Sequence, residues 1–230
     1  MARNRDITVV AVHGAWADGS SWKEVILGLQ RKGLRVVAAP IPLTSLADDT
    51  AALKRTIARI QGPVILVGHA YAGAVIAAVN DERVKALVYI AGLAPEEGET
   101  VAQVFYRDEK HPQSPQFAPD AVGFIWMPEE GFRNAFAQHA TEDQLTIAAA
   151  VQRPISVKCI QEPIPHTWRS KPSWYLIAEE DRMINPKTQH FMAKRMGATI
   201  RSLHIDHTPL LSAPQEVVDI ILEARETTGM

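Results

Sequence analysis

The sequence is poor in three features that would point to particular classes of protein. It contains a single cysteine, Cys159, so no disulfide can form within the chain. Its 24 basic and 26 acidic residues give a net charge of −2, which argues against a nucleic-acid partner and against binding to an anionic membrane. No window approaches the roughly 18 consecutive apolar residues of a membrane span. The first six residues lack a signal-peptide pattern, and we expect a cytoplasmic protein.

The apolar pattern alternates between strand-like and helix-like segments along most of the chain. Runs of β-branched and other apolar residues end at glycine, proline or polar residues, and helical spacings of apolar residues follow them. Over 230 residues, this alternation predicts one α/β domain with a doubly wound, mostly parallel sheet and right-handed crossovers. The predicted strands are residues 7–12, 34–39, 64–67, 84–90, 173–178 and 199–205, and the main predicted helices are residues 22–32, 46–60, 186–196 and 214–225.

The alternation stops between residues 95 and 168. This segment contains scattered prolines, aromatic residues and short helical patterns at residues 131–139 and 142–151. It has no long apolar run of its own, which argues against a second independent domain. We therefore predict a helical cap at residues 95–168, inserted into an α/β core formed by residues 1–94 and 169–230.

A tight turn after the predicted strand 64–67 is the centre of the candidate site. The small residues Gly68, Ala70 and Gly73 allow a strand and a helix to close together around a strained turn residue. Two later predicted strands are followed by chemically active side chains, first the acids at 179–181 and then His207. Because the carboxyl ends of parallel strands meet at one edge of a sheet, we expect these side chains to lie near the turn.

Each of these polar residues also has a structural explanation. Three adjacent acids, Glu179, Glu180 and Asp181, usually form a solvated loop, and at most one of them can face His207. Asp206 is the neighbour of His207 in an extended segment, so the two side chains diverge. A metal pair of His204 and His207 lacks a third ligand, and we predict no metal. The histidines assigned structural roles are His111, His139, His166, His190 and His204.

Several motifs, in their order along the chain, resemble those of the small α/β-hydrolases of the esterase and hydroxynitrile-lyase-like branch, to which plant methyl esterases are related. The main motifs are His13-Gly-Ala-Trp16, Gly68-His-Ala-Tyr-Ala-Gly73, Glu180-Asp-Arg182 and Asp206-His207. The resemblance covers essentially the whole chain. It implies the α/β-hydrolase fold and carboxylesterase activity on a small-molecule ester, with no cofactor and no metal.

Under this resemblance, position 70 corresponds to a nucleophilic serine, Asp181 to the acid of a catalytic triad and His207 to its base. The backbone N–H groups of Ala15 and Tyr71 correspond to the donors of an oxyanion hole. Aromatic residues near such a site either fill the core or contact the ligand. The predicted substrate contacts are Trp16, Trp126 and Trp168.

Ala70 departs from the family pattern because a methyl group cannot attack a carbonyl. Our hypothesis is that the alanine was introduced deliberately in place of a parent serine, so that an uncleaved ester is held and turnover is impaired. A natural pseudoenzyme or ligand receptor would instead use the same pocket for binding only. A lyase or a cofactor-free oxygenase would act through His207 and Asp181 without the serine. The sequence leaves open which ester binds and whether the chain forms a homodimer.

Overall fold

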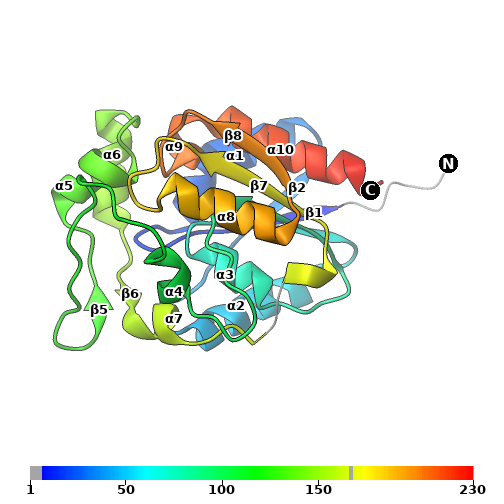
Figure 1. Cartoon of the computed structure of the whole chain (residues 1–230). Helices are drawn as coiled ribbons and strands as arrows, with labels where there is room; N and C mark the ends of the chain where they lie inside the picture. The colour runs from blue at the N-terminus through cyan, green and yellow to red at the C-terminus, as the bar shows by residue number, and fades with distance from the viewer. Residues whose placement is uncertain (1–6, 166–167, 230) are drawn as a thin grey trace.

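The computed structural model describes residues 7–165 and 168–229, and its centre is one six-stranded sheet (Figure 1). The strand order is β2-β1-β3-β4-β7-β8, and every neighbouring pair is parallel. The predicted doubly wound parallel sheet is confirmed. The strands are β1 (Thr8–Val12), β2 (Arg35–Ala39), β3 (Val64–His69), β4 (Val84–Ile90), β7 (Ser173–Ala178) and β8 (Thr199–Leu203).

Helices cover both faces of the sheet (Figure 1). One face carries α1 (Lys23–Arg31), α9 (Pro209–Ser212) and α10 (Pro214–Thr227), and the other carries α2 (Leu46–Ala58), α3 (Ala72–Ala77) and α8 (Pro186–Met196). Along β3, Val64 and Leu66 belong to the core on the α2 and α3 side, whereas Ile65 and Val67 belong to the core on the α1 and α10 side. Successive side chains of a strand point to opposite faces, so a central strand of apolar residues needs both layers.

The segment between β4 and β7 contributes no strand to the six-stranded sheet within its described residues. Most of its elements lie to the left of the sheet in Figure 1. We call residues 95–165 the intervening segment, and its assignment as a separate cap stays a prediction. Its elements are α4 (Val101–Phe105), β5 (Phe124–Ile125), α5 (Glu129–Gly131), a π-helical turn (Phe132–Phe136), α6 (Glu142–Val151), β6 (Ile155–Ser156) and α7 (Val157–Gln161).

The predicted elements differ from the structure mainly at their ends. The helical pattern at residues 131–139 is divided between α5 and the π-helical turn, which ends at Phe136. The predicted helix 22–32 begins with a 3₁₀ turn, Gly19–Trp22, because the Asp18 side chain accepts a hydrogen bond from the Ser20 N–H as an N-cap. Strand β3 continues two residues past its apolar run and ends at His69. His69 is therefore held in the sheet directly before the tight turn.

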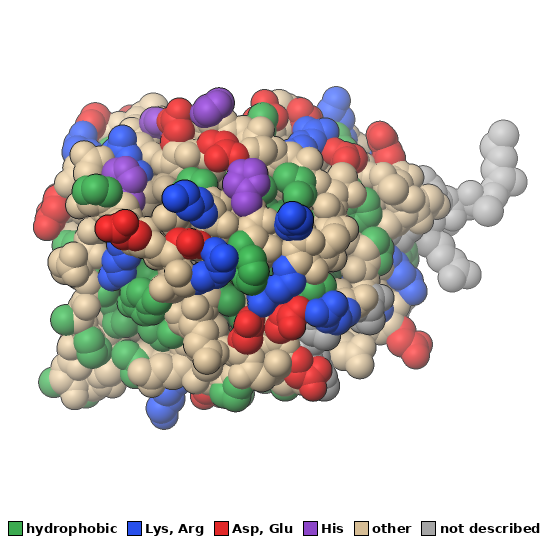
Figure 2. All heavy atoms as spheres, viewed as in Figure 1, with side chains coloured by type: hydrophobic (Ala, Val, Ile, Leu, Met, Phe, Trp, Pro, Cys, Tyr) green, Lys and Arg blue, Asp and Glu red, His purple; other side chains and the backbone are tan. Residues whose placement is uncertain are grey.

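The described helices include none that is long and apolar enough to cross a membrane. Figure 2 shows basic and acidic side chains interspersed over one face of the molecule, in the orientation of Figure 1. Among the described residues, the large apolar side chains with substantial exposure are Leu27, Tyr106, Val122, Trp126, Ile147 and Ile200.

Candidate active site

The turn between β3 and α3 holds Ala70 in a left-handed backbone conformation, with φ of 49°. A residue other than glycine rarely adopts this conformation, which costs about 1–3 kcal/mol. The surrounding backbone compensates, since the Ala70 N–H donates to the Ile90 carbonyl at 3.1 Å and the Ala70 carbonyl accepts from Leu93 N–H at 2.9 Å. The strained turn is therefore fixed by β4 and by the loop that follows it.

Two glycines allow this turn to form because backbone passes where a side chain would be. A Cβ atom at Gly68 would lie 2.7 Å from the Ala72 carbonyl oxygen, and one at Gly73 would lie 2.5 Å from the Leu93 carbonyl oxygen. Both distances are too short for any side chain, so glycine is required at both positions. The motif read from the sequence thus has a steric cause.

The loop after β1 packs directly against the same turn. A Cβ atom at Gly14 would lie 3.1 Å from the Ala70 Cβ and 3.0 Å from the His69 carbonyl oxygen. The glycine lets the backbone of Ala15 approach the turn. Within the described residues, neither the Ala15 N–H nor the Tyr71 N–H has a hydrogen-bond acceptor. Two backbone donors without acceptors in the described part of the chain therefore belong to residues that line the same cavity as Ala70.

The loops after β7 and β8 bring a carboxylate and an imidazole together. The Nδ1–H of His207 donates to Oδ2 of Asp181 at 2.7 Å, and both side chains are buried. Among the four acids considered from the sequence, Asp181 is the one at His207 Nδ1 (Glu179 pairs with His190, Glu180 with His139, and Asp206 accepts from the His139 N–H). The Nε2 atom of His207 has no hydrogen-bond partner among the described residues. His207 also lines the cavity described below.

Asp181 is held by three further donors besides His207. Its Oδ1 accepts from the N–H groups of Met183 and Ile184 at 2.7 and 2.8 Å, and its Oδ2 accepts from Nε2 of Gln189 at 2.7 Å. Gln189 is itself buried, and its Oε1 accepts from the Ala178 N–H at 3.0 Å. A buried carboxylate needs such donors because burial removes its water shell. These four hydrogen bonds together fix the orientation of the Asp181 carboxylate.

A second imidazole lies against the first. The Nε2–H of His69 donates to the backbone carbonyl of His207 at 2.8 Å, and the two ring centroids are 4.9 Å apart. Burial, and then the neighbouring His207, lower the pKa of His69 to about 3. His69 is consequently neutral at physiological pH and acts as a fixed donor to the backbone of the catalytic candidate.

A cavity of about 60 Å³ lies in front of these groups and is lined mainly by apolar side chains from the turn, the loops and the intervening segment. Ala15, Trp16, Ala70, Tyr71 and His207 all contribute to its wall. The Trp16 ring stacks on Phe117 at 4.7 Å, and Phe136 lies between Trp16 and His207, 6.4 and 5.4 Å from their rings. The cavity wall next to His207 is therefore mainly apolar.

Two of the three predicted aromatic contacts lie elsewhere. Trp126 does not line the cavity; it is 52% exposed and its indole N–H donates to Asp120. Trp168 is buried, with the Arg169 guanidinium over its ring, and it is also absent from the cavity wall. Trp16 is the one that lines the cavity, with its indole N–H donating to the Ile125 carbonyl at 2.9 Å. The structure therefore brings Trp16, but neither Trp126 nor Trp168, to the wall of this cavity.

Four of the five predicted structural histidines are among the described residues, and each has a polar contact. His190 pairs with Glu179 at 2.6 Å, and His139 pairs with Glu180 at 3.0 Å. His204 is 3.9 Å from Glu180 and largely exposed, and His111 accepts from the Gln113 N–H. His166 lies outside the described residues.

Sequence reasoning missed Gln189 and His69. Gln189 lies on α8, eight residues after Asp181, and nothing in its local pattern distinguishes it from a surface glutamine. His69 had a weak signal, since it is the residue before the turn in a buried strand and a polar residue there needs a partner. Both roles depend on which loops meet at the strand ends.

Comparison with known proteins places this geometry in a family. A model of the alpha/beta hydrolase family matches residues 9–220. The chain is 24% identical to norfluorocurarine synthase 2 from a Strychnos species, with 94% of each chain covered. It is 31% identical over 107 residues to the carbendazim hydrolyzing esterase of Nocardioides, which covers 40% of this chain and 44% of that protein. The crystal structure of polyneuridine aldehyde esterase matches with a TM-score of 0.83 at 18% identity, over 95% of this chain and 98% of that one, and thus has the same fold.

Proposed function

The chain belongs to the alpha/beta hydrolase family, and from this premise we propose that its cavity is a serine carboxylesterase site in which Ala70 occupies the nucleophile's position. The substrate class is a small, mostly apolar carboxylic ester. The similarity to proteins named as esterases supports the reaction class. The mainly apolar cavity wall supports the substrate class.

One observation carries this assignment. The buried His207–Asp181 pair, with 2.7 Å between Nδ1 and Oδ2, leaves the His207 Nε2 without a partner among the described residues, and His207 and Ala70 line the same cavity. Ala70 sits on a left-handed turn at the end of the central strand β3, where such a turn aims its side chain out over the sheet. A hydroxyl on that side chain would need a base, and the imidazole of His207 belongs to the same cavity wall.

With a serine at position 70, the reaction would proceed in two acyl transfers. The hydroxyl oxygen attacks the ester carbonyl while His207 Nε2 takes the hydroxyl proton. The N–H groups of Ala15 and Tyr71 donate to the oxyanion. The protonated His207 then gives its proton to the leaving alkoxide. Water, deprotonated by His207, attacks the acyl-enzyme carbonyl, and His207 returns the proton to the serine oxygen as the acid is released. Asp181 stabilises the imidazolium in each step.

The chain with Ala70 lacks only the attacking oxygen. Removal of the nucleophile of a triad lowers kcat by about 10⁶ in a well-studied protease and leaves binding contacts in place. We therefore expect this chain to bind its ester and to hydrolyse it poorly. The expected impairment belongs to position 70 and to no other part of the site.

The test is the Ala70→Ser variant, assayed with p-nitrophenyl acetate and butyrate. We expect the kcat for hydrolysis to rise by about 10⁴ to 10⁶ over the chain with Ala70. A double variant that also carries His207→Ala is the matched control and should lose this gain. A folded Ala70→Ser variant with no more activity than the starting chain would contradict the proposed function.

A second candidate function follows from the combination of an intact His207–Asp181 pair with the methyl group of Ala70. A lyase or a cofactor-free oxygenase needs a base to remove a proton from its substrate, and it needs no nucleophile at position 70. Turnover of an acidic C–H or cyanohydrin substrate by the chain with Ala70, lost in His207→Ala, would favour this function. Binding without any turnover, even in Ala70→Ser, would favour a receptor.

A further inference from the structure

Another buried carboxylate lies behind the cavity wall, hydrogen-bonded to Tyr71 of that wall. Asp49, on α2, is fully buried. Its Oδ1 accepts from the Leu43 N–H at 2.7 Å, and its Oδ2 accepts from the Tyr71 hydroxyl at 2.7 Å. The Cys159 thiol also points at Oδ2, at 3.6 Å. The site assigned above does not use any of these side-chain contacts.

Asp49 has no basic partner in the described part of the chain, since no Lys, Arg or His nitrogen lies within ion-pair distance of it. Burial raises the pKa of Asp49, against the lowering effect of its hydrogen bonds from Tyr71 and Leu43. An apolar residue at this position would avoid the cost of burying a carboxyl group. The carboxyl is therefore better explained by what it holds in place than by core stability.

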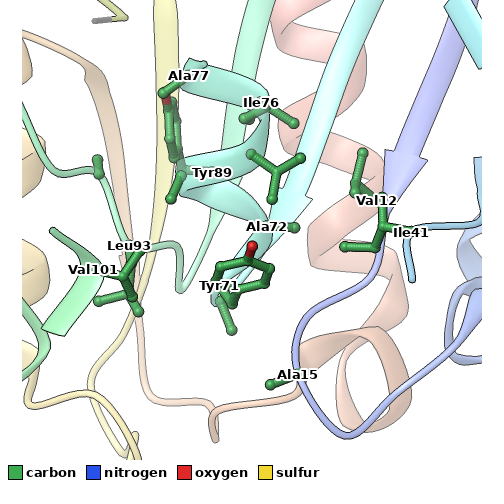
Figure 3. Packing of buried hydrophobic residues seen from close by; sticks show 14 of the residues in the cluster. Val12, Ala15, Ile41, Tyr71, Ala72, Ile76, Ala77, Tyr89, Leu93 and Val101 are labelled. Atoms are coloured by element: carbon green, nitrogen blue, oxygen red, sulfur yellow. The ribbon is translucent and has the colours of Figure 1, made fainter. Parts of the chain in front are cut away.

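Tyr71 is the residue that Asp49 holds, and it is also part of the cavity wall. Its ring lies among the apolar side chains of the core, and in the view of Figure 3 its hydroxyl is on the side away from Ala15. Its backbone N–H is the one next to Ala70. A single hydrogen bond at the tip of the ring thus restrains the residue that supplies a proposed oxyanion donor.

Asp49 also joins this residue to the intervening segment. Leu43 is in a left-handed conformation, with φ of 61°, and its carbonyl accepts from the Ser156 N–H of β6 at 2.9 Å. Cys159 lies on α7, between Ile155 and Ile160, which both line the cavity. The Asp49 carboxyl therefore contacts the turn after β2, the turn after β3 and the edge of the intervening segment.

We propose that Asp49 is a positioning residue of the active site, which fixes the Tyr71 N–H through the Tyr71 hydroxyl and so sets the oxyanion hole. The consequence for catalysis rests on the proposed ester hydrolysis, whereas the positioning of Tyr71 does not. Asp49 touches neither the cavity nor a reacting atom. Its effect should therefore appear in kcat more than in KM.

The kinetic test uses the Ala70→Ser chain as its background. Tyr71→Phe keeps the ring and removes the hydroxyl, and Asp49→Leu removes the acceptor. Each should lower kcat by about tenfold or more, up to the 10²–10³ that loss of an oxyanion donor costs, with KM changed less than about twofold. The double variant should be no slower than either single variant, because both break one link.

Two further variants separate positioning from general stability. Asp49→Asn keeps a hydrogen bond to each partner, since the Tyr71 hydroxyl can accept as well as donate, and it should retain most of the kcat. Asp48→Asn, at the exposed neighbour on the same helix, is the matched control and should leave kcat unchanged. A lower melting temperature with unchanged kcat in Tyr71→Phe and Asp49→Leu would overturn the proposed role. A loss of kcat in the double variant equal to the product of the two single losses would also overturn it.

A readout without turnover keeps the positioning role testable if Ala70→Ser shows no esterase activity. In the chain with Ala70, the amide of residue 71 should shift its NMR resonance and exchange its hydrogen faster in Asp49→Leu and in Tyr71→Phe. It should do neither in Asp48→Asn. An unchanged residue-71 amide in both variants would overturn the role of Asp49, whereas an inactive Ala70→Ser variant with a shifted amide would contradict only the esterase assignment.

Discussion

Two buried carboxylates, Asp181 and Asp49, each hold a residue of the cavity wall, and their hydrogen-bond partners differ in kind. Asp181 accepts four hydrogen bonds, one of them from the imidazole of His207. Asp49 accepts from a backbone N–H, a phenol and, weakly, a thiol. An imidazole gains and loses a proton near neutral pH. Burial, and then the charge of Asp49, raise the pKa of Tyr71 well above its usual range, so the phenol stays protonated.

We call His207 with Asp181 the chemical side of the site, and Tyr71 with Asp49 the geometric side. The Asp181 side holds a base, so the charge of that carboxylate matters whenever His207 takes a proton. The Asp49 side holds a group that does not titrate, so only the position of its hydrogen bond matters. We therefore expect neutral substitutions to be severe at position 181 and mild at position 49.

The largest expected effect tests the chemical side. In the Ala70→Ser chain, Asp181→Asn should lower kcat by about 10⁴, the loss known for the same change in a serine protease triad. The cause is that the amide N–H of asparagine disfavours the Nδ1–H tautomer of His207. Esterase kinetics with a short p-nitrophenyl ester measure this loss. If Asp181→Asn costs no more than Asp49→Asn, the two sides do not differ in the proposed way.

An intermediate effect concerns stability at acid pH. His69, which lies beside His207, and Asp49 should contribute to it with opposite signs. Because the folded pKa of His69 is about 3, against 6.5 when the residue is unperturbed, protons bind more readily to the unfolded chain in this range. Its contribution to stability is present above pH 6.5 and is lost as the pH falls toward 3. At pH 4.5 this loss is roughly 2–3 kcal/mol.

His69→Gln should remove this loss, so urea unfolding at pH 4.5 and pH 7.5 should show a flatter pH dependence than in the starting chain. Asp49, whose pKa is raised, contributes stability at low pH that is lost as the pH rises through its folded pKa. Asp49→Asn should therefore steepen the loss of stability toward acid. An unchanged pH dependence in His69→Gln would contradict the assignment of a neutral His69.

The smallest expected effect concerns the thiol on the geometric side. The Cys159 sulfur is 3.6 Å from Asp49 Oδ2, which makes a weak hydrogen bond at best. Cys159→Ala should cost about 1 kcal/mol of unfolding free energy and change the kcat of the Ala70→Ser chain by less than about twofold. Thermal or urea unfolding and esterase assays check both values. A tenfold fall in kcat would show that the thiol shares the role of the Tyr71 hydroxyl.

Much of the fold and part of the site could be predicted because they depend on short stretches of sequence. The period of apolar residues identifies strands such as β4 and helices such as α8, each with the predicted bounds. Gly68 and Gly73 mark the turn because no side chain fits at either position. Parallel strands end at one edge, which places residues 70, 181 and 207 near one another before any contact is known.

The sequence by itself determined the order of strands and helices, the sharp turn at Ala70 and the edge of the sheet that carries the polar residues. Only the tertiary structure decided which aromatic rings line the cavity, and that His69, Gln189 and Asp49 hold His207, Asp181 and Tyr71. Periodicity and turn chemistry act over a few residues, whereas the bonds from His69 and Asp49 join residues 138 and 22 positions apart. Such partners meet through the packing of whole elements, which leaves no local pattern at either residue.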